Sequence, residues 1–240
     1  MRARAPIVAA LAGAALLAAS ARGAAPRPAG TVTFLAGDAT RTAGGKAEKL
    51  GAGSAVHAGD VLETGRRTRL EVKLADESVL RLGPASRVRV EEASFGGSAE
   101  DRKVGAKLLV GKIWANVAKA VGGEARFEVR TENAVAGVRG TTFRVDAATD
   151  RSVVVKVYGG TVAVAAARVP RPEHGGAKPE RREVAGPQEV SREQWEKIVT
   201  SMMQVRVSAA GLPTEPEAFA LAKAGGDEWE EWNRSRDAGN

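Results

Sequence analysis

The stretch from Thr131 to Val145, T-E-N-A-V-A-G-V-R-G-T-T-F-R-V, constrains the fold of this chain more than any other. Two runs of β-forming residues flank the segment from Gly137 to Gly140, so the backbone is expected to bend sharply there. Glycine takes positive φ angles that cost other residues energy, and it marks bulges and corners of sheets. The stretch does not combine a nucleophile, a base and oxyanion donors, which acyl or phosphoryl transfer needs. It therefore predicts a structural corner rather than a catalytic loop.

Arg139 lies inside this bend, and its guanidinium has two plausible roles. In the first, its five N–H donors hold carbonyl groups that the bend leaves without strand partners. In the second, it binds an anionic ligand in the corner. We favour the structural role for the whole motif, which comprises Gly137, Val138, Arg139, Gly140, Thr141 and Phe143.

Alternation of apolar and polar residues predicts short strands from Gly30 onward. The clearest case is the segment 69–90, where apolar positions alternate with charged ones between turn signals, and we expect a three-stranded antiparallel meander there. Glycines at positions 30, 111 and 160 each lead into an alternating strand, at irregular spacing, which suggests a body of coiled short strands. We therefore predict a mainly β domain over residues 30–169, antiparallel and sandwich- or solenoid-like.

After residue 169 the pattern changes. Residues 170–181 are rich in proline and charge and predict a flexible loop, and residues 182–190 predict a return to the sheet. From Ser191 onward the spacing is helical, because Ser191 and Gln194 form a capping-box pattern. Helices are predicted over 191–203, from Thr214 or Pro216 to Ala224, and over 227–236. Residues 182–240 are thus expected to form return strands and a short α-helical C-terminal appendage.

Trp195, Trp229 and Trp232 lie on the predicted helices. A buried indole contributes a large area on a small element, so these rings are expected to dock the helices onto the β domain. The alternative is an exposed aromatic interaction surface that stacks against the sugars of a polysaccharide. The solvent exposure of the three indoles separates the two interpretations.

The N-terminus has the pattern of a secretory signal peptide over residues 1–21. Arg2 and Arg4 precede an apolar run from Ile7 to Ala19, which is shorter than the roughly 20 residues that span a bilayer. Small residues follow, and cleavage is expected after Ala21; an uncleaved anchor is the less favoured alternative. Residues 22–29 predict a spacer. No later segment has the pattern of a membrane span, so we expect a periplasmic or secreted protein that is not an integral membrane protein.

Charge is unevenly distributed along the mature chain. From Ser191 onward there are six basic and nine acidic residues, against 28 basic and 20 acidic in the preceding mature portion. A basic body favours an anionic surface such as peptidoglycan or lipid headgroups, or an acidic partner protein. Aromatic residues make up only 4% of the chain and no recognition helix is evident, so nucleic acid is not expected as a partner.

Metal and enzyme chemistry are poorly supported by the sequence. The chain has no cysteine and only two histidines, His57 and His174, so thiolate sites are excluded and a histidine-based metal centre is not expected. The adjacent acids Asp76-Glu77 and Glu91-Glu92 are better explained as turn and strand residues than as a catalytic pair, because neighbours on a strand point to opposite faces. We expect neither a cofactor nor catalytic residues.

Four ordered blocks of the sequence resemble the FecR domain family. They are G-S-x-V-x-x-G-D-V-x-x-T from Gly53, S-V-L-R-L-G-P-x-S from Ser78, L-x-x-G-K-I from Leu109 and A-V-A-G-V-R-G-T-x-F from Ala134. In its founding members this domain is the periplasmic sensor of a membrane regulator that relays the state of a TonB-dependent outer-membrane transporter to a cytoplasmic sigma factor. This chain shows neither a sigma-binding segment nor a transmembrane helix ahead of the β domain.

The resemblance therefore implies an all-β periplasmic fold with a non-catalytic role. We expect a protein-interaction or sensing module of the cell envelope with an envelope protein as its partner. The alternative is a module that binds cell-wall or surface glycan.

Overall fold

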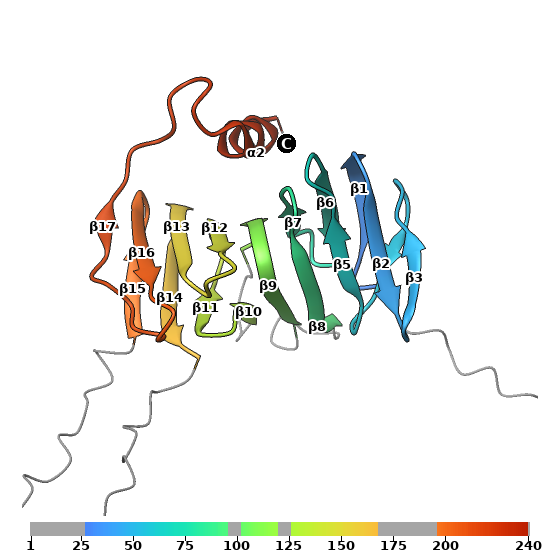
Figure 1. Cartoon of the computed structure of the whole chain (residues 1–240), viewed down its shortest axis with the longest axis horizontal. Coiled ribbons are helices and arrows are strands. Elements are labelled where there is room, and N and C mark those ends of the chain that lie inside the picture. The colour runs from blue at the N-terminus through green and yellow to red at the C-terminus, as the bar shows by residue number, and fades with distance from the viewer. Residues whose placement is uncertain (1–26, 96–101, 120–125, 168–195, 240) are drawn as a thin grey trace, which may run out of the picture.

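The computed structural model describes residues 27–95, 102–119, 126–167 and 196–239 of the chain. In these residues, seventeen strands form two sheets, and one helix, α2 (Glu228–Ala238), follows them. Figure 1 shows the strands side by side along the long axis, from β3 (Lys46–Lys49) at one end to β17 (Glu217–Ala218) at the other. The predicted mainly β fold with a short C-terminal helix is confirmed.

Sheet A, as we name the sheet that lies next to α2, has nine strands in the order β4-β1-β6-β7-β9-β12-β13-β16-β17, all antiparallel to their neighbours. Its members besides β17 are β4 (Ala55–Val56), β1 (Gly30–Ala36), β6 (Arg69–Leu74), β7 (Val79–Leu82), β9 (Arg102–Asn116), β12 (Thr142–Ala147), β13 (Val153–Gly159) and β16 (Met203–Val207).

Sheet B has the order β3-β2-β5-β8-β9-β10-β11-β14-β15, in which only the β9–β10 pair is parallel. Its members besides β3 and β9 are β2 (Ala39–Ala43), β5 (Val61–Thr64), β8 (Arg87–Phe95), β10 (Arg126–Arg130), β11 (Ala134–Val138), β14 (Thr161–Ala166) and β15 (Glu196–Thr200).

Strand β9 belongs to both sheets and joins them. Its residues 102–110 pair with β8 in sheet B, and its residues 111–116 lie between β7 and β12 in sheet A. The bend falls at Gly111, whose φ of +99° is strained for residues with a side chain. A glycine at this position therefore allows one strand to run through both layers.

The hydrophobic core lies between the two sheets. Apolar residues that alternate along each strand meet there in one cluster, and its large members include Leu62, Leu82, Leu108, Ile113 and Phe143, all fully buried. Phe127 of sheet B meets Phe143 of sheet A edge to face, with 6.3 Å between the ring centroids. The apolar side of each sheet thus packs against the other sheet, which leaves the outer sides available for contacts with other elements or molecules.

Hydroxyl side chains connect successive crossings between the sheets. Thr64 Oγ1 donates to the Gly83 carbonyl at 2.7 Å and accepts from the Ser86 amide at 2.9 Å. Ser86 Oγ donates to the Lys112 carbonyl at 3.1 Å and accepts from the Lys112 amide at 2.8 Å. Backbone groups that leave a ladder at a corner need other partners, and these hydroxyls supply them.

The stretch 131–145 forms a corner, as its sequence predicts, but only one of its glycines has the special backbone conformation. Gly137 lies within β11, whereas Gly140 lies between β11 and β12 with a φ of +61°. Thr141 Oγ1 donates to the Thr161 carbonyl at 3.0 Å, and Phe143 enters the core. Arg139 is exposed at the corner.

The two glycines of this corner are expected to respond differently to substitution. Gly140→Ala should lower the free energy of unfolding by at least about 1 to 2 kcal/mol, because alanine pays that much in the left-handed region. Its Cβ would also lie 2.6 Å from Lys119 Cγ, so the Lys119 side chain must shift. Gly137→Ala should cause no loss, since an added Cβ meets no atom within 4 Å and alanine reduces the entropy of the unfolded chain. Urea denaturation of both variants checks this, and a larger loss at position 137 would contradict it.

The predicted meander over residues 69–90 is wrong in its third strand. Strands β6 and β7 form a hairpin in sheet A, but β8 crosses to sheet B and pairs with β5 and β9. The crossing occurs at Pro84-Ala85, where Ala85 has a φ of +49°. Alternation is the same for a strand in either sheet, so it could not show which sheet β8 joins.

Two of the three predicted C-terminal helices are also wrong. Residues 196–207 form β15 and β16, which extend the two sheets beyond residue 169 by pairing with β14 and β13. Pairing with the edges of β14 and β13 satisfies a whole row of backbone hydrogen-bonding groups. This gain outweighs the local helical spacing of the segment. Residues 214–224 hold only the short strand β17, which pairs with β16. The predicted signal peptide, the loop 170–181 and Trp195 lie outside the described residues.

Candidate functional site

One row of side chains crosses the outer face of sheet A. The cross-strand register places these residues opposite one another on eight successive strands, so they share one side of the sheet. The row consists of Phe34, Glu71, Arg81, Trp114, Arg144, Lys156, Gln204 and Glu217. We call it the outer row.

Strand alternation explains why these residues point away from the core. Leu70 and Val72 flank Glu71, and Leu80 and Leu82 flank Arg81, in each case with the apolar neighbours buried between the sheets. A polar residue at such a position is normally solvated. Here Glu71, Arg81 and Arg144 are 5%, 0% and 3% exposed, so another element must cover them.

Helix α2 is that covering element, and Figure 1 shows it lying outside the strands near the middle of the molecule. Asp227 caps its N-terminus and accepts hydrogen bonds from the amides of Trp229 and Glu230. Acidic residues occupy the first turn and Arg236 the last, which matches the helix dipole. The predicted helix over 227–236 is confirmed, and its side chains supply the partners of the outer row.

The C-terminal end of α2 is bound by a four-residue ion-pair cluster. Arg81 Nε donates to Glu71 at 2.7 Å, and Arg81 Nη1 donates to Asp237 at 2.7 Å. Arg236 binds both oxygens of Glu71 at 2.8 and 2.9 Å. Trp114 Nε1 donates to Asp237 at 2.8 Å. Glu71 of the sheet therefore binds one cation of the sheet and one of the helix, and Asp237 of the helix binds two side chains of the sheet.

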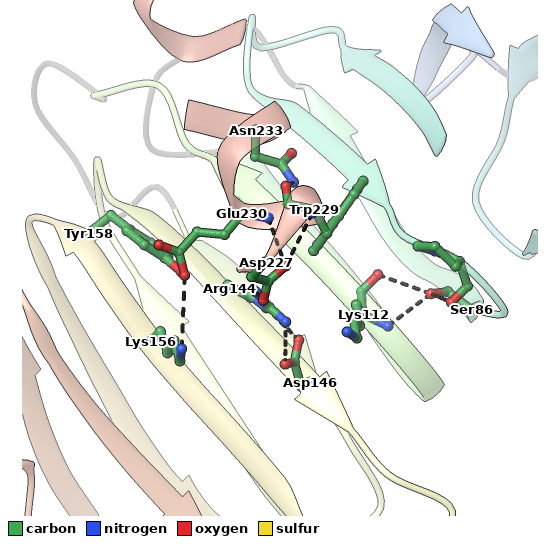
Figure 2. A network of polar contacts seen from close by, with 11 residues as sticks. Ser86, Lys112, Arg144, Asp146, Lys156, Tyr158, Asp227, Trp229, Glu230 and Asn233 are labelled. Atoms are coloured by element: carbon green, nitrogen blue, oxygen red, sulfur yellow. Dashed lines mark hydrogen bonds and ion pairs between the residues drawn. The ribbon is translucent and has the colours of Figure 1, made fainter. Parts of the chain in front are cut away.

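The N-terminal end of α2 is bound by a second cluster, which Figure 2 shows from close by. Arg144 makes two hydrogen bonds of 2.7 Å to Asp146 and one of 2.6 Å to Asp227. Tyr158 donates to Glu230 at 2.9 Å. Asp227 thus has two roles, because it caps the helix and also fixes it to strand β12 through Arg144.

Aromatic rings fill the space between these clusters. The Trp229 and Trp232 rings stack at 5.3 Å, and Phe34 meets Trp232 at 5.5 Å. The Trp229 ring lies over Gly83, where a Cβ would approach it to 3.1 Å. Among the buried side-chain atoms described, Arg81 Nη2 and Trp229 Nε1 have no hydrogen-bond partner. The Arg81 guanidinium instead lies 5.7 Å from the Trp232 ring centroid, within the range of a cation–π contact.

The structure places two of the three predicted tryptophans, Trp229 and Trp232, in this interface. Trp229 is 5% exposed and Trp232 is partly buried, so the Trp229 ring docks the helix and does not present an aromatic surface to solvent. The motif residues from Gly137 to Phe143 lie outside the contacts of α2. The next residue, Arg144, belongs to them, although the sequence prediction did not include it.

Three ionisable groups of the site, Glu71, Asp227 and Tyr158, have pKa values shifted away from neutrality. Burial alone would raise the pKa of Glu71, but hydrogen bonds from Arg236, Arg81 and Thr33 outweigh it and lower the pKa to about 2. Burial would likewise raise the pKa of Asp227, yet Arg144 lowers it. Burial and the Glu230 carboxylate raise the pKa of the Tyr158 hydroxyl. These groups therefore act as fixed charges and hydrogen-bond partners at neutral pH.

The low pKa of Glu71 predicts a loss of stability in acid. A carboxylate with a lowered folded-state pKa stabilises the fold above its ordinary value of 4.5, and this contribution is lost as the pH falls toward about 2. The free energy of unfolding should therefore fall between pH 4.5 and pH 2, less steeply in Glu71→Gln than in the parent chain. Urea denaturation across this range tests it. Glu63→Gln, which removes an exposed ion pair with Arg87, should keep the parent slope.

An open cleft of about 740 Å³ lies between α2, the segment that precedes it and sheet A. Trp114, Tyr158 and Arg234 are among its lining residues. In the described part of the chain, no group of three or more His, Cys, Asp or Glu side chains is arranged to hold a metal ion. None of the helices described there is long and apolar enough to cross a bilayer.

Comparison with known proteins identifies a family over the central part of the chain. Residues 60–163 match the family described as FecR protein, whereas no curated protein matches. Two crystal structures of a candidate anti-sigma factor from Parabacteroides distasonis ATCC 8503, at 2.50 and 1.65 Å resolution, are similar to the chain with TM-scores of 0.45. They are 17% and 16% identical to it, over 66% and 74% of this chain and 59% and 74% of theirs, so the chain spans less than two thirds of the first. The match over residues 60–163 supports the predicted resemblance of this part of the chain to the FecR domain family.

Proposed function

We propose that this protein is a non-catalytic interaction or sensing module of the cell envelope, exported to the periplasm or beyond it. The FecR match over residues 60–163 carries the proposal, since the domain is a sensor in the founding members of its family. The partner is expected to be an envelope protein.

The electrostatics of the contact between α2 and sheet A support a non-catalytic role. A general acid or base works best with a pKa near the operating pH. Glu71, Asp227 and Tyr158 instead have pKa values shifted away from neutrality, and each has a hydrogen-bond partner. Side chains with a fixed protonation state and a hydrogen-bond partner are suited to holding packed elements together and to binding another protein surface.

Export is supported by residues 1–21, which have the charged, apolar and small-residue regions of a signal peptide in that order. The mature chain would begin at Arg22. Its lack of cysteine suits a fold that is stabilised by its core, whatever the redox state of the compartment.

Crosslinking of the tagged full chain in intact cells tests the proposal. We expect the chain in the envelope fraction with Arg22 as its N-terminal residue, and we expect it crosslinked reproducibly to one envelope protein. A full-length chain in the cytoplasm would contradict export. Sedimentation with purified peptidoglycan is the companion experiment, because binding that persists at high salt would favour a glycan ligand over a protein partner.

A further inference from the structure

We propose, on the basis of this interaction function, that the outer row is a docking site for an acidic, tryptophan-bearing helix of a partner protein. In the structure α2 occupies this site as an internal substitute for the partner. The partner helix would displace α2 and take over its ion pairs.

Charge complementarity defines the chemistry of the partner. The sheet presents three cations, Arg81, Arg144 and Lys156, and α2 places one carboxylate against each of them. Asp237 is 2.7 Å from Arg81, Asp227 is 2.6 Å from Arg144 and Glu230 is 3.9 Å from Lys156. A partner helix needs carboxylates with the same spacing, which places them on one face.

Aromatic contacts add a second requirement. Trp232 lies between Phe34 and the Arg81 and Arg236 guanidinium groups, and Trp229 packs over Gly83. Tryptophan and arginine dominate the binding energy of many protein interfaces. A partner helix without indoles at these two positions would leave the centre of the site unfilled.

The polarity of the covered face explains how α2 can leave. A helix docked on an apolar face cannot move away without exposing that face to water. Here the uncovered positions would include the charged Glu71, Arg81, Arg144 and Lys156, which water solvates readily, beside the aromatic Phe34 and Trp114. Buried ion pairs are also weak evidence for stability, because desolvation offsets much of their attraction. The contact between α2 and the outer row is therefore selective but reversible.

The chain that leads to α2 is suited to such a release. Residues 208–226 are mostly exposed, and their only regular element is the two-residue strand β17. Leu212 and Leu221 are 49% and 38% exposed, and Phe219 holds this segment to the sheet through its contacts with Tyr158 and Lys156. The FecR match contains all three cations of the site and ends at residue 163, well before α2. Helix α2 can thus separate without breaking the family domain.

A peptide-binding experiment tests the site on the mature chain, residues 22–240. The probe is a fluorescein-labelled peptide with the sequence of residues 225–239, and its binding is followed by fluorescence anisotropy. The double variant Asp227→Asn/Asp237→Asn, which we call the released chain, lacks two carboxylates of its own α2. It should bind the peptide about tenfold more tightly than the parent chain, because the site is then free in a larger fraction of molecules. Equal affinity of the parent and released chains would overturn the proposal.

Two further variants of the released chain locate the binding. Lys156→Glu reverses a charge of the outer row and should abolish the gain in affinity. Lys103→Glu makes the same change at an exposed position of sheet B and should have no effect. Thermal melts check that each variant folds, and Lys156→Gln replaces Lys156→Glu if the latter does not. Binding that Lys156 substitution leaves unchanged would place the peptide elsewhere and refute the site.

The same variants in intact cells separate this proposal from the proposed function. Crosslinking to the envelope partner should rise in the released chain and fall when Lys156→Glu is added. An envelope partner crosslinked equally to all variants would preserve the interaction function and overturn the docking site. Peptide binding without any envelope partner would contradict the interaction function instead. Light scattering that shows a dimer of the released chain would assign the site to a second copy and also overturn the proposal.

Discussion

Arg81→Ala is expected to lower the free energy of unfolding by about 3 kcal/mol, the lower end of the cost of breaking a buried ion pair. The Arg81 side chain is fully buried and binds both Glu71 and Asp237 at 2.7 Å. Its removal takes one cation away from two carboxylates, of which Glu71 is nearly buried and Asp237 is 16% exposed. The cost stays near 3 kcal/mol because Glu71 keeps Arg236 and Asp237 keeps the Trp114 indole.

Arg87→Ala is the matched control. Arg87 Nε lies 2.8 Å from Glu63, nearly the distance of the Arg81 pairs, but both side chains are about half exposed. Exposed pairs contribute at most about 1 kcal/mol, so this variant should unfold almost as the parent does. Urea denaturation at pH 7 measures both variants. Equal losses at the two positions would show that burial does not determine the effect.

The sequence predicted the parts of this fold that depend on local pattern. Alternation located most strands, since apolar residues at every second position lie in the core, and the helix predicted over residues 227–236 corresponds to α2. The apolar spacing of the sequence wrongly predicted a helix over residues 196–203, because Ile198, Val199 and Met202 are spaced as on a helix. In the structure Val199 is buried and Ile198 is 56% exposed, which is the alternation of a strand. Partner strands that are distant in sequence decided between the two patterns.

The candidate site could not be predicted from local pattern, because it depends on register. Glu71, Arg81 and Arg144 come from three different strands, and only the pairing through β9 places them in one row. A signal was nevertheless present in the sequence. Each is a charged residue between two core positions, and α2 carries acids and tryptophans on one face. A charged stripe on a sheet and a complementary terminal helix together suggest a docked pair.

Gly111→Ala is expected to lower the free energy of unfolding by about 2 to 5 kcal/mol. Two penalties combine at this position. Alanine at a φ of +99° pays about 1 to 2 kcal/mol of backbone strain. Its Cβ would also lie 2.4 Å from Ser86 Oγ and 2.5 Å from Ser86 Cα, and relieving such a clash costs roughly another 1 to 3 kcal/mol.

Gly53→Ala separates the two penalties. Gly53 has a similar φ of +84°, but an added Cβ there meets no atom within 4 Å. This variant should therefore lose only the strain contribution, about 1 to 2 kcal/mol, and urea denaturation measures both variants. The difference between them shows how tightly the Ser86 corner is pressed against the bend of β9. Equal losses would mean that the corner yields freely, and the two sheets would then be joined less rigidly than the hydrogen bonds between Ser86 and Lys112 indicate.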